Sequence, residues 1–206
     1  MLQTASVHPA TLAILKKVMQ MPEFRQFNLV GGTALALQIG HRLSIDLDLF
    51  THEEYDSDKI LQALQSLGNL DTLVDNPPYL QVRLDDVKMD FLKFPYTFVQ
   101  ECIETEGIRL VSIENIAVMK LLAIARRGVK KDFFDLYFIL ERYRLEEILQ
   151  IFEAKLPHVD MFHILKSMTF FGDAEPGGDP KMLIKVTWEN LKKVITQKVN
   201  DYLKSR

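Results

Sequence analysis

The stretch Leu29–Phe50, "LVGGTALALQIGHRLSIDLDLF", contains the features that decide the fold. A short apolar run stops at Gly31 and Gly32, a stretch of small residues with helical spacing follows, and a second apolar run then contains two aspartates. This order predicts a strand, a glycine turn, a short helix and a second strand. Carboxylates are costly inside an apolar strand unless a cation meets them. The second strand is therefore the first place to look for chemistry.

The acids of this second strand are expected to share one face. In "SIDLDLFT" polar and apolar residues alternate, so Ser44, Asp46 and Asp48 should lie on one side and Ile45 on the other. Two adjacent carboxylates repel each other unless a divalent ion neutralises them. Asp90, inside the strand-like run "VKMDFLKF", could complete an oxygen-only set that suits Mg²⁺ or Mn²⁺. Three such acids could hold two metals for displacement at phosphorus.

The glycine pair indicates the other half of a phosphate site. Gly31 and Gly32 lack Cβ atoms, so the backbone can approach an anion, and the N–H groups of the following helix point at it. Thr33 could add a hydroxyl donor and Arg42 could clamp a phosphate, whereas His41 is expected to pack or turn. Neither a Gly-Gly pair nor an Asp-x-Asp pair is specific alone. Their combination, with the first acid about fourteen residues after the glycines, is far more specific.

The pattern over the rest of the first half predicts alternating helices and strands. An amphipathic helix should start at Pro9, a capped helix should end at Gly68, and three strand-like runs with turn signals between them follow. These runs are "NLDTLVD", "YLQVRLD" and "VKMDFLKF".

The second half is expected to be helical. After Ile108 four segments carry helical period and strand patterns nearly vanish, which places a boundary near residue 105 between lobes 1–105 and 106–206. Trp188, with Phe133, Phe134 and Tyr137 at helical spacing, is expected to form core. The run "AEPGGDP", 174–180, is expected to be a mobile loop.

Composition narrows the possible functions. A formal net charge of −3 gives no global basic excess for binding nucleic acid, although a local patch is compatible with it. The single Cys102 excludes an intramolecular disulfide and a cysteine-built zinc site, and the five histidines lack metal-ligand spacing. No apolar run approaches the roughly 20 residues of a membrane span, and the N-terminus does not read as a signal peptide. We therefore expect a cytoplasmic protein that does not enter a membrane.

Two motifs resemble a known family. "GGTALALQIGHRLSIDLDLF" resembles the first motif of the AbiEii/AbiGii toxin-like nucleotidyltransferases, a branch of the DNA polymerase β superfamily. "MKLLAIARRGVKKDFFDLYFIL", Met119–Leu140, resembles that family's later Lys…Lys-Asp-x-x-Asp motif, and the resemblance covers roughly residues 25–140. It implies an α+β fold: a minimal, polymerase β-like nucleotidyltransferase core with a mixed sheet and flanking helices, then a helical C-terminal lobe that closes the active-site cleft.

In the first lobe the resemblance assigns roles to individual residues. It implies that Asp46 and Asp48 bind metal, that Asp90 is the third acid, and that Ser44 contacts phosphate. A third carboxylate is also the natural general base for an acceptor hydroxyl. The residues of the implied nucleotide site are Gly31, Gly32, Thr33, Arg42, Ser44 and Lys120.

In the second lobe the resemblance implies that Lys120 is a catalytic lysine that offsets triphosphate charge. Asp132 and Asp135 match the two acids of the Lys-Asp-x-x-Asp element and share a helix face. A structural alternative stays open, in which these acids anchor Arg126, Arg127 or Lys131 of "RRGVKK", 126–131, in a network that joins the lobes. That basic run is otherwise an ordinary turn, or it holds the triphosphate or an RNA backbone.

The function implied by the resemblance is transfer of a nucleoside monophosphate from a nucleoside triphosphate (NTP) to an acceptor hydroxyl, with Mg²⁺ or Mn²⁺. The favoured acceptor is RNA, at a transfer RNA (tRNA) end, in a toxin-like component of a type IV toxin–antitoxin or phage-defence system with a cognate antitoxin. One alternative is modification of a small hydroxylated molecule such as an antibiotic. Another is a non-catalytic descendant that binds nucleotide or protein.

Overall fold

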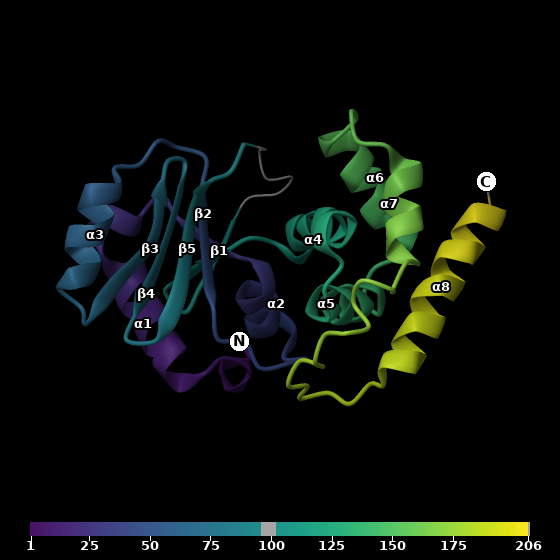
Figure 1. Ribbon diagram of the computed structural model, residues 1–206, viewed down its shortest axis with the longest axis horizontal. Helices are drawn as coiled ribbons and strands as arrows, with labels where there is room; N and C mark the ends of the chain where they lie inside the picture. The colour runs from purple at the N-terminus through teal and green to yellow at the C-terminus, as the bar shows by residue number, and fades with distance from the viewer. Residues whose placement is uncertain (96–101, 206) are drawn as a thin grey trace. The chain divides into compact units, whose positions relative to one another are not determined.

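The computed structural model describes residues 1–95 and 102–205, and the chain divides into two compact units, Met1–Ser112 and Ile113–Arg206 (Figure 1). The sequence placed the boundary near residue 105. The division falls later because two further strands still pair within the sheet of the first unit.

The first unit is built on one mixed sheet. Its described strands follow the order β3-β4-β5-β2-β1-β7-β6. β2 runs parallel to β5 and antiparallel to β1, while β1 runs parallel to β7. The strands are β1 (Asn28–Val30), β2 (Leu47–Thr51), β3 (Leu70–Asn76), β4 (Tyr79–Leu84), β5 (Val87–Lys93), β6 (Ile103–Thr105) and β7 (Ile108–Leu110). The expected mixed sheet with flanking helices is confirmed.

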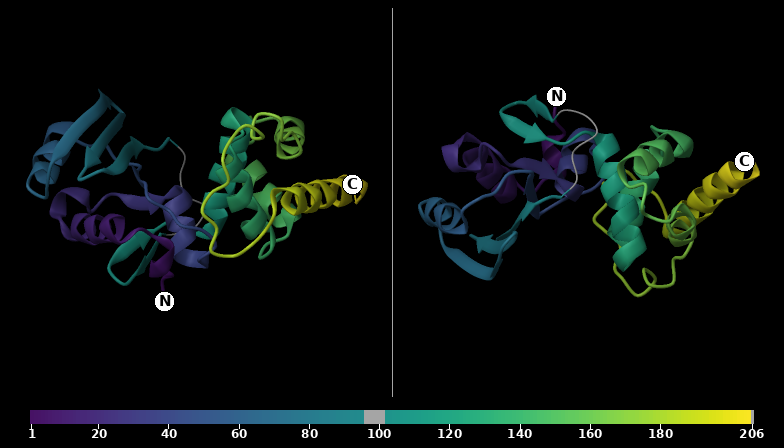
Figure 2. Two further views of the ribbon diagram at one scale, coloured as in Figure 1. Left: turned by 60° about the horizontal axis from the view of Figure 1, so that its bottom comes forward. Right: turned by 90° about the horizontal axis from the view of Figure 1, so that it is seen from above.

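Local sequence explains the helices of this unit. α1 (Pro9–Gln20) begins at a proline, whose fixed φ suits the first helical turn. α2 (Gly31–Ile39) starts at the two glycines, which therefore belong to the helix instead of preceding it. The Asp56 side chain caps α3 (Ser57–Gln65), which ends before the predicted Gly68. In Figures 1 and 2, α1 and α3 lie on one side of the strands and α2 on the other.

A large part of the apolar core lies on one face of the sheet. Phe91 of β5 packs against Phe24 and Phe27, with ring centroids 5.7 and 5.3 Å away. Leu47 and Leu49 of β2 are fully buried on the same face, because residues two apart on a strand point the same way. The intervening residues of β2 and β5 are therefore directed to the opposite face.

The predicted strand from Ser44 is too long. β2 begins only at Leu47, and Ser44 instead forms an isolated bridge with Val7. Because the backbone at Ser44 pairs outside the β2 ladder, the alternation does not extend to it: Ser44 is buried, whereas Ile45 is 57% exposed. The expectation that Ile45 lies on the apolar face is wrong.

The second unit is helical, as expected. α4 (Ile113–Arg127) packs against α5 (Lys130–Leu140), α6 (Leu145–Lys155) and α7 (Met161–Met168), and α8 (Trp188–Lys204) packs on α5, α6 and α7. The sequence patterns predicted four of these helices and missed α7, whose signal is the N-cap residue Asp160. No helix in the described ranges is long and apolar enough to cross a membrane.

The aromatic core of this unit surrounds Trp188. Its ring stacks on Phe134 and meets Phe133 and Phe171 edge-on, which confirms the core role predicted for Trp188, Phe133 and Phe134. Tyr137, predicted with them, is only half-buried and packs against Phe138.

The segment 174–180, expected to be mobile, is held by specific contacts. Glu175 accepts hydrogen bonds from Trp188 Nε1 (3.0 Å) and Lys192 Nζ (2.7 Å). Asp179 pairs with Lys130 at 2.9 Å. Composition alone could not show these contacts, because each partner lies far away in the sequence.

Candidate active site

Asp48 and Asp90 are neighbours on two adjacent strands. β2 and β5 run parallel in a register that pairs Asp48 with Asp90. Both are half-buried, and both alternate with the buried residues that face the apolar core. Paired positions on adjacent strands point to the same side of a sheet, so the two carboxylates share the face opposite the core.

Residues of β4 hold Asp90 in place. Its Oδ1 accepts hydrogen bonds from Gln81 Nε2 (2.8 Å) and Tyr79 Oη (3.2 Å), and Lys88 Nζ lies 3.5 Å from Oδ2. Burial, together with the charges of Asp90 and Asp48, raises the pKa of Tyr79 to about 12. Tyr79 thus stays a protonated donor beside two carboxylates.

The sequence pattern did not predict Tyr79 and Gln81 as residues of the site. They precede Asp90 by a hairpin, in a strand-like run where polar residues alternate with apolar ones. That alternation was the available signal. It could not be connected to the acids without the register that pairs Gln81 with Asp90.

Gly31 lies directly against Asp48. A Cβ atom at residue 31 would be well within 3.0 Å of Asp48 Oδ2, closer than real Cβ atoms come. Gly31 also has φ +67°, which residues with a side chain rarely adopt. The first glycine therefore lets the start of α2 approach an acid of β2, which is a different reason for glycine from the phosphate approach that we predicted.

Gly31→Ala is expected to destabilise the first unit by at least about 1–2 kcal/mol, the cost of a left-handed alanine, and to displace the Asp48 side chain. A displacement of this kind costs about 10²-fold in turnover. Gly40→Ala is a matched control, because Gly40 also has a left-handed φ (+70°) but faces the side chain of Gln3. Both variants should lose stability in urea unfolding. Equal turnover of the two would contradict the contact with Asp48.

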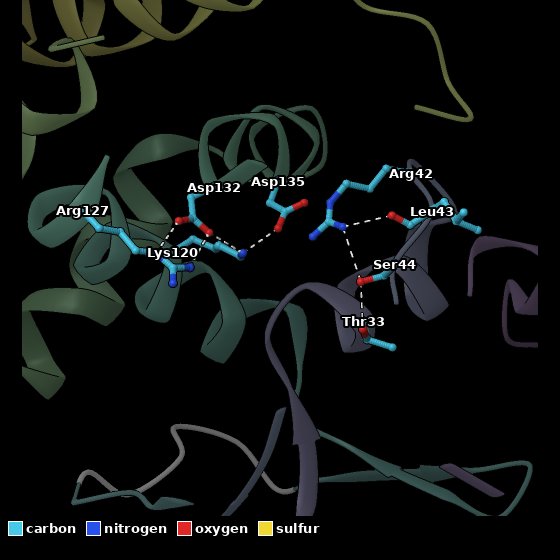
Figure 3. Close-up of polar contacts among 8 residues, drawn as sticks. All are labelled: Thr33, Arg42, Leu43, Ser44, Lys120, Arg127, Asp132 and Asp135. Carbon is cyan, nitrogen blue, oxygen red and sulfur yellow. Dashed lines mark hydrogen bonds and ion pairs between the residues drawn. The ribbon is translucent and has the colours of Figure 1, made fainter. Parts of the chain in front are cut away.

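A chain of polar side chains leads into β2. Thr33 Oγ1 donates to the backbone carbonyl of Asp46, and Thr33 Oγ1 and Ser44 Oγ are 2.8 Å apart. Arg42 Nη1 donates to Ser44 Oγ at 3.4 Å and to the Leu43 carbonyl at 3.2 Å (Figure 3). Since the Thr33 proton goes to Asp46, the Ser44 hydroxyl must donate to Thr33.

The hydrogen bonds among these side chains stabilise the local structure without a bound ligand. Thr33, Arg42 and Ser44 are buried, and both hydroxyl protons are used inside the protein. The chain fixes the segment that positions Asp46, which is half-buried just before β2. The phosphate contacts expected of Thr33, Arg42 and Ser44, and of Gly31 and Gly32, stay predictions.

The three expected metal ligands are not gathered as a set. Across residues 1–95 and 102–205, no three His, Cys, Asp or Glu side chains form a group able to hold a metal. What the structure does bring together is the pair Asp48 and Asp90. Two carboxylates that share a half-buried face, with oxygen as the only donor atom, fit a hard divalent cation. Metal binding by Asp46, Asp48 and Asp90 stays a prediction.

In the second unit Lys120 lies between two fully buried acids. Its Nζ is 2.8 Å from Asp132 Oδ1 and 2.5 Å from Asp135 Oδ2 (Figure 3). Arg127 adds a second cation to Asp132, through Nε at 2.9 Å and Nη2 at 3.2 Å. The Lys120 side chain is 6% exposed and that of Arg127 is 55% exposed. We call these four residues the buried ion network.

The network keeps Asp132 charged. Burial alone would raise the pKa of Asp132, but the charges and hydrogen bonds of Lys120 and Arg127 lower it below its ordinary value. Part of the structural alternative is present, because Asp132 pairs with Arg127, one of the three cations that it named. The ion pair shown for Asp135 is with Lys120, outside the basic run. The catalytic roles predicted for Lys120, Asp132 and Asp135 stay predictions.

Comparison with known proteins identifies the family. A family model described as "Nucleotidyl transferase AbiEii toxin, Type IV TA system" matches residues 13–202. The chain belongs to the AbiEii family. By this family membership it is a nucleotidyltransferase.

Similar proteins extend this family assignment. An uncharacterised protein of Aquifex aeolicus (strain VF5) is 33% identical over 197 residues, covering 93% of this chain and 95% of the relative. The solved structure of MenT4, a nucleotidyltransferase toxin of Mycobacterium tuberculosis H37Rv, has a TM-score of 0.64 at 15% identity and covers 92% of this chain and 80% of its own. The antibiotic-resistance factor ANT(2'')-Ia has a TM-score of 0.54 at 16% identity and covers 70% and 90%. At these identities the two structures show a shared fold.

Proposed function

We propose that this AbiEii nucleotidyltransferase transfers a nucleoside monophosphate from an NTP to a hydroxyl of RNA, at a tRNA end, and depends on Mg²⁺ or Mn²⁺. The observation that carries the proposal is the register pairing of Asp48 with Asp90 on one half-buried face. A pair of carboxylates on neighbouring strands is the arrangement expected where a divalent cation and a triphosphate meet.

Asp48 and Asp90 would hold the metal, with Asp46 as a further ligand from the segment before β2. The metal would supply Lewis-acid stabilisation of the charge that develops on the phosphoryl oxygens. The protein's own contribution is position: Gly31 lets α2 approach Asp48, and the chain from Arg42 to Asp46 fixes the entry to β2.

Asp90 is the residue that we propose as general base. Gln81 and Tyr79 both donate to its Oδ1 and so orient the carboxylate, and a fixed carboxylate can accept the proton of the attacking hydroxyl. Tyr79 and Gln81 therefore act as positioning residues. The family's Lys120 would offset triphosphate charge, although in this structure its charge is balanced inside the buried ion network.

The choice of RNA and of a toxin role rests on family membership. The family description names a toxin and a type IV toxin–antitoxin system, and MenT4 is described as a nucleotidyltransferase toxin. We propose the same role here: a cytoplasmic toxin that uses NTP and tRNA and is countered by a cognate antitoxin. Modification of a small hydroxylated molecule is a separate outcome of the test below.

The test is transfer of label. The purified protein is incubated with Mg²⁺, with each of the four α-labelled NTPs in turn, and with total bacterial tRNA, and the same reactions are run with EDTA. Label should enter RNA with at least one NTP, and only when metal is present. Transfer in EDTA would refute metal dependence. NTP binding without labelling of RNA would refute RNA as acceptor and favour a small molecule.

A further inference from the structure

We propose that the turn between α4 and α5 in the second unit, residues 126–131, is a contact surface for the phosphate backbone of the acceptor RNA. We call this segment, "RRGVKK", the basic turn. The inference rests on the proposed RNA acceptor and adds where the protein holds it. Four of its six residues are cations, in a chain whose net charge is −3, so the charge is concentrated locally.

Two of these cations have no partner among the residues that the structure describes. Arg127 pairs with Asp132 and Lys130 pairs with Asp179. Arg126 and Lys131 are exposed, and neither forms a hydrogen bond or ion pair with any residue of the described ranges. The basic turn therefore has charge available for an external anion.

Electrostatic stabilisation of the two helices explains only some of the cations in the basic turn. Arg126 and Arg127 lie in the last turn of α4, where cations interact well with the negative end of the helix dipole. Lys130 and Lys131 lie in the first turn of α5, at the positive end, where a cation is unfavourable. The N-cap residue of α5, Val129, provides no side-chain cap. The first turn of α5 also contains Asp132, whose charge is balanced by Lys120 and Arg127. The N-terminal N–H groups and the exposed Lys131 therefore leave a positive potential that favours phosphate.

The chain already places carboxylates against this turn. Asp179 pairs with Lys130 at 2.9 Å. Asp173 lies beside Gly128, because a Cβ atom added to Gly128 would be 3.5 Å from the Asp173 Cβ. Both acids come from the segment that follows α7. A phosphate of a bound RNA would compete with Asp179 for Lys130.

Contacts with phosphate are detected by measuring the affinity for tRNA and its dependence on salt concentration. Arg126→Ala/Lys131→Ala is expected to weaken tRNA binding, measured without NTP, by about tenfold and to reduce the slope of log K against log salt by about 1.4 to 1.8, the value for two lost contacts. Lys193→Ala/Lys204→Ala, which removes two exposed lysines of α8, is the matched control of equal charge and should bind like wild type. Arg126→Lys/Lys131→Arg keeps both positive charges and should bind tRNA like wild type.

A second variant tests the competing carboxylate. Asp179→Asn frees Lys130 and should tighten tRNA binding by about threefold. Glu153→Gln changes an exposed acid of α6 and is the charge-matched control. It should not change the affinity for tRNA.

The outcomes separate this inference from the proposed function. If wild type labels RNA but the Arg126/Lys131 variant binds tRNA like its control, the basic turn is not the contact surface and the RNA acceptor stands. If the same variant loses ATP binding and keeps tRNA binding, the turn holds the triphosphate and the inference is overturned. If wild type neither binds nor labels tRNA, both fail.

Discussion

Asp48→Asn is expected to reduce nucleotide transfer by at least about 10³-fold, several kcal/mol of transition-state stabilisation, while the protein stays folded. Asparagine keeps the size of the side chain beside Gly31 and removes the negative charge that Asp48 places next to Asp90. The loss should therefore appear in turnover with a saturating NTP and without a loss of thermal stability. Transfer of α-labelled NTP to RNA measures it.

Asp71→Asn is the matched control. Asp71 is an exposed acid on β3, at the edge of the same sheet, so the substitution changes charge by the same amount away from Asp48. The control should turn over like wild type. If Asp48→Asn also kept wild-type turnover, the assignment of Asp48 to the metal site would be wrong.

Lys120→Met is expected to destabilise the second unit by about 3–5 kcal/mol, because it removes the cation that two buried carboxylates share. Methionine matches the length of the aliphatic part of lysine, so little of the loss comes from packing. Urea unfolding followed by the fluorescence of Trp188, the single tryptophan, reports on this unit. Lys193→Met, on an exposed position of α8, should leave the midpoint unchanged.

A double variant separates structure from catalysis. Lys120→Met/Asp135→Leu removes one carboxylate along with the lysine and leaves Asp132 paired with Arg127, so much of the stability should return. If transfer returns as well, the buried ion network is structural. If stability returns and transfer does not, the predicted catalytic role of this pair is supported. An unfolding midpoint of Lys120→Met equal to that of wild type would contradict the network's contribution to stability.

The sequence predicted the parts of the site that depend on local pattern. Alternation of polar and apolar residues predicted strands around Asp48 and Asp90, and helical period predicted α4 and α5 with Asp132 and Asp135 on one face. These predictions succeeded because burying one face imposes a period of two on a strand and 3.6 on a helix.

The same reasoning failed at Ser44 and Ile45. Their alternation looks like a continuation of β2, yet Ser44 pairs with Val7 and Ile45 is exposed. A period read from sequence shows which residues alternate. It does not show where the hydrogen-bonded ladder begins, because that depends on which partner the backbone meets.

By itself, the sequence determined the class of fold, the order of its main helices and strands, and the two motifs that lead to the AbiEii family. Only the tertiary structure decided that Asp48 faces Asp90, that Gly31 lies against Asp48, and that Arg127 pairs with Asp132. The physical reason is the separation in sequence between the residues that interact. Period and capping depend on neighbours a few residues away, whereas strand register, close approach and ion pairing join residues that only the folded chain brings together.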